Sequence, residues 1–216
     1  MDFTIALSFK KSNRGEYSLI WLTSDLHLFH NKEFVYKSRG FETVEEMNEK
    51  IIENINSMCG PDDDLYILGD LMLYGSRENG LFLGLQLLEQ LRPKVHLIQG
   101  NHDTTRKLEL IAQLPNMVEV TGGKFLNYKN YSLFLSHYPM FTRNSDYFKP
   151  LRNKVINLYG HTHTEDPMEM FSLDTLNYNV GLDAHGCFPV DLPTVIEEIK
   201  LEHDKLKALL LSLIHI

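Results

Sequence analysis

Apolar positions in the first half of the chain alternate between short runs and amphipathic segments. Three runs have the length of buried strands, and each is followed at once by polar residues: 17–23, 65–68 and 95–98. Three longer segments have the apolar spacing or content of helices that cover a sheet: 43–56, 81–91 and 104–114. Thr43, with Glu46 three residues later, is a typical helix N-cap. This alternation predicts an α/β layer.

The second half of the chain predicts mostly strands. In chain order they are 118–121, 124–128, 131–135, 155–159 and 177–182. The first three are joined by the tight turns Gly122-Gly123 and Lys129-Asn130, so we expect them to pair antiparallel. A helix over 192–210 follows, and 3–9 is an expected edge strand at the other end. We therefore predict a single domain over 1–210, with two packed sheets and helices outside them.

The last six residues, 211–216, have two interpretations. The sequence Leu-Ser-Leu-Ile-His-Ile is encoded by the bases CTG TCT CTT ATA CAC ATC, which match a widely used transposase sequencing adapter. The hexapeptide is therefore either derived from an adapter or the ordinary apolar end of a helix. The codons of the source DNA distinguish the two, because any other codon choice removes the adapter interpretation.

Composition and charge narrow the class of protein. The chain has 216 residues, 43% of them hydrophobic, which suits one domain with a sizeable core. Its formal net charge of -8 argues against broad, charge-driven binding to nucleic acid, which needs a basic face. The two cysteines, Cys59 and Cys187, are isolated, as in a reduced intracellular protein. Without a signal-peptide pattern or an apolar run of roughly 18 residues, we expect a cytoplasmic protein with no membrane association.

Residues with metal-binding chemistry follow five of the predicted strands. They are Asp25 and His27, Asp70, Asn101 and His102, His137, and His161 and His163. Each set alone has an ordinary explanation, since solvated turns and single structural histidines are common. All five sets, however, fall where an apolar strand ends, and alternate residues of an extended segment point the same way. Because open α/β sheets bind ligands at the carboxyl ends of their strands, we expect one shared cleft.

The ligand types restrict the metal. Imidazole, carboxylate and amide oxygen, without thiolate, suit Mn²⁺, Fe or Zn²⁺. A closed structural zinc site has four ligands and is often rich in cysteine, whereas this set is larger and richer in oxygen. The set suffices for two divalent ions, which need a bridging ligand, and Asp70 is the candidate bridge. A hydroxide shared by the two ions would have a pKa near neutrality and act as the nucleophile.

The chain resembles the calcineurin-like metallophosphoesterases between Asp25 and His163. It has, in order, the motifs Asp-x-His, Gly-Asp, Gly-Asn-His-Asp, His and Gly-His-x-His. The resemblance implies an α/β fold, namely a four-layer α/β sandwich in which two mixed β-sheets are flanked by helices. It also implies two divalent metal ions, with Mn²⁺ expected first and Fe, Zn²⁺ or Ni²⁺ as alternatives.

Carried over position by position, the resemblance implies two ligand sets and one further catalytic histidine. One ion would be bound by Asp25, His27, Asp70 and His163. The other would be bound by Asp70, Asn101, His137 and His161. His102 matches the family's histidine that binds no metal but stabilises charge on the phosphoryl group or protonates the leaving oxygen. That role is chemically reasonable, because a departing alkoxide needs a proton or positive charge.

A narrower likeness is to small bacterial and phage-encoded phosphoesterases of the same superfamily. It is carried by Ser24-Asp25-Leu26-His27, His30-Asn31, Arg39-Gly40-Phe41, Met47-Asn48-Glu49 and residues 179–186. Many relatives have glycine shortly after the first metal-binding histidine, whereas this chain has Leu28-Phe29, which changes how closely the backbone approaches a substrate. His30, Asn31 and Arg39 are the candidates for gripping a phosphate oxygen, although an exposed arginine is usually only a solvated surface residue.

The predicted function is hydrolysis of a phosphate monoester or phosphodiester of a small, nucleotide-like substrate, with His102 and Asp70 as catalytic residues. The size of the chain favours a small phosphorylated partner over a large one. Two alternatives stay open: a metal-dependent nuclease, which the net charge disfavours, and a non-catalytic metal-binding scaffold of the same fold. A scaffold is expected to lose ligands or the charge-stabilising histidine, and this chain retains both. The sequence predicts no oligomeric state.

Overall fold

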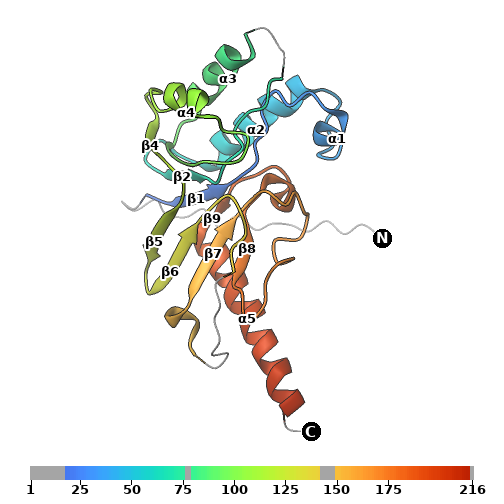
Figure 1. Cartoon of the computed structure of the whole chain (residues 1–216), viewed down its shortest axis with the longest axis vertical. Coiled ribbons are helices and arrows are strands. Elements are labelled where there is room, and N and C mark those ends of the chain that lie inside the picture. The colour runs from blue at the N-terminus through green and yellow to red at the C-terminus, as the bar shows by residue number, and fades with distance from the viewer. Residues whose placement is uncertain (1–17, 76–78, 142–148, 215–216) are drawn as a thin grey trace.

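Two β-sheets form the centre of the molecule (Figure 1). The computed structural model describes residues 18–75, 79–141 and 149–214. Within these residues the first sheet has five strands in the order β4-β3-β2-β1-β9. They are β1 (Ile20–Thr23), β2 (Asp64–Ile67), β3 (Lys94–Ile98), β4 (Met117–Thr121) and β9 (Val190–Asp191). Strands β1 to β4 run parallel, and β9 is antiparallel to β1.

The second sheet has four strands within the described residues, in the order β5-β6-β7-β8. They are β5 (Lys124–Tyr128), β6 (Tyr131–Leu135), β7 (Val155–Tyr159) and β8 (Asn177–Asn179). Strands β5 and β6 are antiparallel, whereas β6, β7 and β8 are parallel. Both sheets are therefore mixed, and the predicted α/β arrangement of two mixed sheets with helices is confirmed.

The turn at Gly122-Gly123 joins the two sheets instead of forming a hairpin. The expectation that 118–121 pairs antiparallel with 124–128 is wrong, because β4 pairs parallel with β3 and β5 pairs with β6. The helix between β3 and β4 explains this result, since a crossover helix lets successive strands lie parallel in one sheet. The other predicted turn, Lys129-Asn130, does form a hairpin, and Lys129 has a left-handed φ of 52°.

Helices cover the face of the first sheet that points away from the second (Figure 1). They are α1 (Glu33–Tyr36), α2 (Val44–Met58), α3 (Gly80–Glu89) and α4 (Thr105–Ile111). Helix α2 begins as predicted, with the Thr43 side chain accepting a hydrogen bond from the Glu46 amide at 3.1 Å. The predicted helices over 43–56, 81–91 and 104–114 are confirmed, with small differences at their ends, whereas α1 was not predicted.

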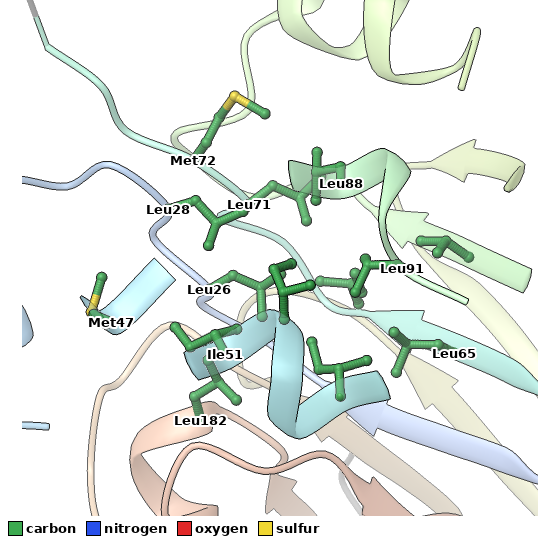
Figure 2. Packing of buried hydrophobic residues seen from close by; sticks show 14 of the residues in the cluster. Leu26, Leu28, Met47, Ile51, Leu65, Leu71, Met72, Leu88, Leu91 and Leu182 are labelled. Carbon is green, nitrogen blue, oxygen red and sulfur yellow. The ribbon is translucent and has the colours of Figure 1, made fainter. Parts of the chain in front are cut away.

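Apolar side chains beside the polar loops anchor those loops in the core (Figure 2). Leu26 follows β1 and Leu71 follows β2, and neither has any exposed surface. They belong to one cluster with Met47 and Ile51 of α2 and with Leu182. Each of these two loop leucines is the sequence neighbour of a predicted metal ligand. Burial of the leucine therefore fixes the direction of its polar neighbour.

A second apolar core lies between the sheets and includes the first turns of α5 (Leu192–Ile214). The predicted final helix over 192–210 is thus confirmed and continues to Ile214. Its last turns project beyond the sheets (Figure 1), and Leu209 and Leu213 are exposed there. Among the described residues, no helix combines the length and the apolar character needed to cross a membrane.

Two other sequence predictions have different outcomes. The strand predicted over 177–182 ends at Asn179, and Leu182–His185 forms a short 3₁₀ helix after it. The edge strand expected over 3–9 lies outside the described residues.

Candidate metal centre

The predicted metal ligands gather where loops from both sheets meet. In chain order they are Asp25 and His27 after β1, Asp70 after β2, Asn101 after β3, His137 after β6, and His161 and His163 after β7. Within the first sheet, the Asp25 amide donates to the Gly69 carbonyl and the His27 amide to the Asp70 carbonyl, each at 3.0 Å. The His161 amide donates to Asp25 Oδ2 at 2.8 Å, so the second sheet is bonded directly to the first at this point.

The first group of potential ligands consists of Asp25, His27 and His163. Their ligand atoms all lie within 4.8 Å of one another. Asp25 Oδ1 is 3.9 Å from His27 Nε2 and 3.8 Å from His163 Nε2. Among the described residues this buried oxygen has no hydrogen-bond partner, which costs free energy unless a cation satisfies it. The donor set therefore fits a divalent metal ion.

The second group consists of Asp25, Asp70 and His137, whose ligand atoms again lie within 4.8 Å of one another. His137 Nδ1 donates to the Leu68 carbonyl at 2.8 Å, which leaves Nε2 as the acceptor of the neutral ring. This Nε2 is 3.6 Å from Asp70 Oδ2 and 2.8 Å from the Asn101 side-chain oxygen. Acceptor atoms this close to one another fit a shared cation.

Burial keeps two of the predicted histidine ligands neutral. Burial, followed by the charge on His163, lowers the pKa of His27 to about 2. Burial and the neighbouring His137 lower the pKa of His161, whose ring centre lies 5.0 Å from that of His137. Neutral imidazole is the form that binds metal, so the electrostatics of the cluster suit that role.

Most of the predicted ligands have a left-handed backbone. The φ angles are 59° at Asp25, 49° at His27, 54° at Asp70, 72° at His161 and 52° at His163. Such angles are uncommon outside glycine and cost about 1–3 kcal/mol each unless the surrounding structure enforces them. Because backbone strain of this kind clusters at functional sites, it independently supports these loops as the functional centre.

Glycines precede three of the predicted ligands because the loops touch through their backbones. A Cβ atom on Gly69 would lie 2.6 Å from His137 Nδ1, and Gly69 itself has a φ of 99°. A Cβ atom on Gly160 would overlap the side chains of Ser24 and Asp25. A Cβ atom on Gly100 would likewise overlap Asp70. Any side chain at these positions would push the ligand loops apart.

Two charged residues for which the motifs predicted no role support the ligand loops. The Asp103 carboxylate accepts hydrogen bonds from the amides of Asp70, Leu71 and Gly100, at 2.8, 3.2 and 2.9 Å. Lys107 Nζ donates to the carbonyls of Met72 and His102, each at 2.8 Å. Asp103 is the last residue of the Gly-Asn-His-Asp motif, which placed it near the candidate site. The sequence does not identify the backbone amides that its carboxylate binds.

A cavity of about 780 Å³ opens beside the first group. Four histidines line it: His27, His30, His102 and His163. His102 is partly exposed, and its Nε2 lies 3.9 Å from Asp70 Oδ2. His30 Nδ1 lies 3.3 Å from His27 Nδ1. Of the three predicted substrate contacts, His30 and Arg39 line the cavity, whereas Asn31 is exposed and does not.

Arg39 is placed differently from what a substrate contact requires. Its side chain is only 2% exposed, and its guanidinium forms a two-pronged pair with the Asp183 carboxylate. Burial alone would raise the pKa of Asp183, but hydrogen bonds from Arg39 and His163 hold it well below its usual range. The sequence could not reveal this pairing, because the two partners are 144 residues apart.

Comparison with known proteins agrees with this geometry. A model of the calcineurin-like phosphoesterase family matches residues 18–206. An uncharacterized protein of Methanocaldococcus jannaschii is 29% identical over 183 residues, which cover 84% of this chain and 91% of that protein. The gene 66 protein of Mycobacterium phage L5 is 24% identical over 190 residues, covering 77% of this chain and 87% of that protein.

A solved structure has the same fold. It is a protein of unknown function from Aquifex aeolicus, 20% identical in sequence, with a TM-score of 0.61. The match covers 84% of this chain and 99% of the Aquifex protein. Because the family model spans most of the chain and includes all the predicted ligands, the chain belongs to the calcineurin-like phosphoesterase family and is a metal-dependent hydrolase of phosphoric esters.

Proposed function

We propose that the protein hydrolyses a phosphate monoester or phosphodiester of a small, nucleotide-like substrate at a centre of two divalent metal ions. The convergence of acceptor atoms carries this proposal: buried Asp25 Oδ1, which has no hydrogen-bond partner among the described residues, and His137 Nε2 facing Asn101 Oδ1. Both arrangements favour cations, at two neighbouring positions. Mn²⁺ is expected first, with Fe, Zn²⁺ or Ni²⁺ as alternatives, because the donors are nitrogen and oxygen without thiolate.

The proposed ligand sets share one carboxylate. One ion would be held by Asp25, His27, Asp70 and His163, and the other by Asp70, Asn101, His137 and His161. Asp70 suits the bridging role because its Oδ2 lies 3.7 Å from His27 Nε2 and 3.6 Å from His137 Nε2. Its Oδ1 accepts the His102 amide at 2.8 Å, which fixes the orientation of the carboxylate.

His102 is the proposed general acid. When bound, two divalent ions lower the pKa of a shared water molecule and neutralise charge on the phosphoryl oxygens. The leaving oxygen still needs a proton or a hydrogen bond. The His102 ring lines the cavity, and its backbone is held from both sides, by Asp70 at the amide and by Lys107 at the carbonyl. These contacts support the proposed role, because they fix the backbone from which the ring would donate to the leaving oxygen.

The cavity wall favours a substrate with one phosphoryl group and an uncharged remainder. Phe34 is 74% exposed beside the cavity, and Val35 and Leu182 extend this apolar lining. Glu165 adds negative charge, and the charge of Arg39 is already paired. A planar base could stack on Phe34, whereas a polyphosphate or a nucleic-acid backbone would lack cationic partners there. The lining thus favours a small nucleotide-like ester over the nuclease alternative.

The test is ester hydrolysis by metal-stripped protein resupplied with Mn²⁺. We expect turnover of bis(p-nitrophenyl) phosphate, of p-nitrophenyl phosphate, or of both, and only when Mn²⁺ is present. Asp70→Asn removes the bridging charge and His102→Ala removes the general acid, so each should lower kcat by about a hundredfold or more. The ratio of the two rates distinguishes a diesterase from a monoesterase.

Asp174→Asn is the matched control, because Asp174 is exposed and does not line the cavity. It should keep the wild-type rate. His102→Ala should also retain bound Mn²⁺, since the proposed role of His102 is catalytic. Folded wild-type protein that binds Mn²⁺ but hydrolyses neither ester would contradict the proposal and favour the scaffold alternative.

A further inference from the structure

The guanidinium of Arg39 has no donor left for a substrate. Its Nε and Nη2 each donate to the Asp183 carboxylate at 2.9 Å. Nη2 also donates to the Asp25 carbonyl at 2.8 Å, and Nη1 to the Leu26 carbonyl at 3.2 Å and to Met47 Sδ at 3.8 Å. A guanidinium has five N–H groups, and these contacts account for all of them. Arg39 therefore acts on the protein itself.

The same carboxylate also contacts a proposed metal ligand. His163 Nδ1 lies 2.7 Å from Asp183 Oδ2, and a carboxylate can only accept, so Nδ1 carries the proton. In the neutral form of the ring, which is the form that binds metal, the lone pair is then on Nε2. That atom points into the first group, 3.8 Å from Asp25 Oδ1 and 3.0 Å from His27 Nε2.

His163 needs such a partner because packing holds it weakly. Its side chain is 40% exposed, whereas that of His27 is 4% exposed and that of His137 is 1% exposed. A half-exposed ring on a loop can rotate unless a hydrogen bond fixes it. Carboxylates that bind the second nitrogen of a metal-bound histidine fix both its orientation and its tautomer.

We propose that Asp183, held by Arg39, is a positioning residue that acts on metal binding through His163. The inference rests on the proposed function only in taking His163 as a metal ligand. The role requires a carboxylate, because three N–H donors from Arg39 and His163 converge on its two oxygens. An asparagine of the same shape would turn an amide N–H towards at least one of these donors.

Arg39 makes the arrangement rigid and electrically balanced. Its planar fork fits both carboxylate oxygens, and its charge offsets that of Asp183. Through the Asp25 and Leu26 carbonyls it also joins the loop after β1 to the 3₁₀ helix that holds Asp183. The Arg39–Asp183 pair therefore holds the His163 ring at a fixed position relative to the loop that carries Asp25.

The experiment is equilibrium dialysis of the full chain against Mn²⁺, with a double-mutant cycle. Wild type, Asp183→Asn, His163→Gln and the double variant are compared. We expect Asp183→Asn to weaken one of two Mn²⁺ sites by about 10- to 100-fold and to leave the other unchanged. Because Asp183 acts through His163, the double variant should bind Mn²⁺ no more weakly than His163→Gln alone.

Asp63→Asn is the matched control. Asp63 accepts hydrogen bonds from the Leu19 and Gly60 amides, each at 2.8 Å, and from Trp21 Nε1 at 3.3 Å. It lies at the amino ends of β1 and β2, whereas the ligand loops lie at their carboxyl ends. Its replacement removes comparable hydrogen bonds without touching a proposed ligand, so both Mn²⁺ affinities should stay at wild-type values.

Either of two results would overturn the proposal. One is that folded Asp183→Asn binds Mn²⁺ with wild-type affinities. The other is that the losses of Mn²⁺ affinity in the two single variants add up in the double variant. If Asp183→Asn does not fold, Arg39→Lys replaces it, since lysine keeps the charge but loses the fork. Arg39→Lys should weaken Mn²⁺ binding at the same site. If it instead binds Mn²⁺ normally but hydrolyses the ester more slowly, Arg39 contacts the substrate and the proposal fails. The two proposals fail separately. Wild-type protein that binds two Mn²⁺ ions but hydrolyses no ester refutes the proposed function, whereas the role of Asp183 is tested by the Mn²⁺ affinities alone.

Discussion

Single side chains around the centre act mainly on the backbone of the ligand loops. Asp103 binds three amides, Lys107 binds two carbonyls, and Arg39 binds two more. All three are buried or nearly so, where charge-assisted hydrogen bonds are strong. Such bonds can enforce the left-handed angles of the loops, which the chain would not adopt by itself. The ligand loops are thus held in place by side chains that bind their backbone amides and carbonyls.

The thiol of Cys59 should be unreactive in the folded protein. Burial, with a smaller effect from Asp63, raises its pKa to about 12. A raised pKa favours the neutral thiol, and each unit lowers the thiolate fraction about tenfold at pH 8. We therefore expect alkylation by iodoacetamide at pH 8 to be at least about a hundredfold slower in native protein than in urea. Cys59→Ser separates its signal from that of Cys187, and equal rates in both states would contradict the expectation.

The placement of individual residues at the candidate centre was predictable where a motif contains them, and was not predictable where burial determines their partners. His27, Asp70 and His137 were identified because their residue types and their places after strands indicate metal chemistry. Arg39 was predicted to contact substrate, because an arginine in a loop looks the same in sequence whether it is exposed or buried. Asp183 received no role, since its partner Arg39 lies 144 residues away in the sequence.

Helix α2 carries its own start signal, and its buried face anchors the loop after β1. The Thr43 side chain accepts the Glu46 amide, and the Glu46 side chain accepts the Glu42 amide at 2.9 Å. Met47 and Ile51 belong to the same buried cluster as Leu26. Local chemistry of this kind is why the helix and its first residue could be predicted from sequence.

Thr43→Ala should lower the free energy of unfolding by about 1 kcal/mol, because the Glu46 amide loses its acceptor. Thr43→Ser keeps the hydroxyl and should stay close to wild type. Urea denaturation followed by circular dichroism measures both. A Thr43→Ala protein as stable as Thr43→Ser would show that the cap contributes nothing.

Strand pairing was less predictable than the elements themselves. The turn at Gly122-Gly123 has the composition of a hairpin, yet it connects β4 in one sheet to β5 in the other. Pairing depends on which neighbour completes a sheet, here β3 after the crossover through α4, and local sequence does not encode that choice. The turn at Lys129-Asn130 follows the local rule because β5 and β6 belong to the same sheet.

At the scale of the whole molecule, the two sheets approach closely at the candidate centre. The His161 amide bonds to the Asp25 carboxylate, and Gly160 packs against Ser24 without room for a Cβ atom. The glycine in Gly-His-x-His is therefore required by the contact between sheets. Its neighbour His161 owes its position to that contact.

Gly160→Ala should separate the sheets at this point. Overpacking should lower the free energy of unfolding by about 1–3 kcal/mol and weaken Mn²⁺ binding. Gly122→Ala is the matched control, because a Cβ atom there meets nothing within 4 Å, and its stability should change by less than about 0.5 kcal/mol. Thermal melts and Mn²⁺ dialysis measure both variants. Wild-type Mn²⁺ affinity in Gly160→Ala would argue against close sheet contact as a requirement of the centre.

Because the proposed ligands come from both sheets, the stability of the fold should depend on the concentration of metal ions around the protein. Ions held as proposed bind only the folded chain, and each one present at a hundred times its dissociation constant adds about 2.7 kcal/mol to the free energy of unfolding. That increment is a large share of the 5–15 kcal/mol typical of natural domains. A shortage of metal in the cell would therefore reduce the activity of this hydrolase in two ways. Active sites without metal would be inactive, and the less stable chain would unfold more often and be degraded faster by proteases.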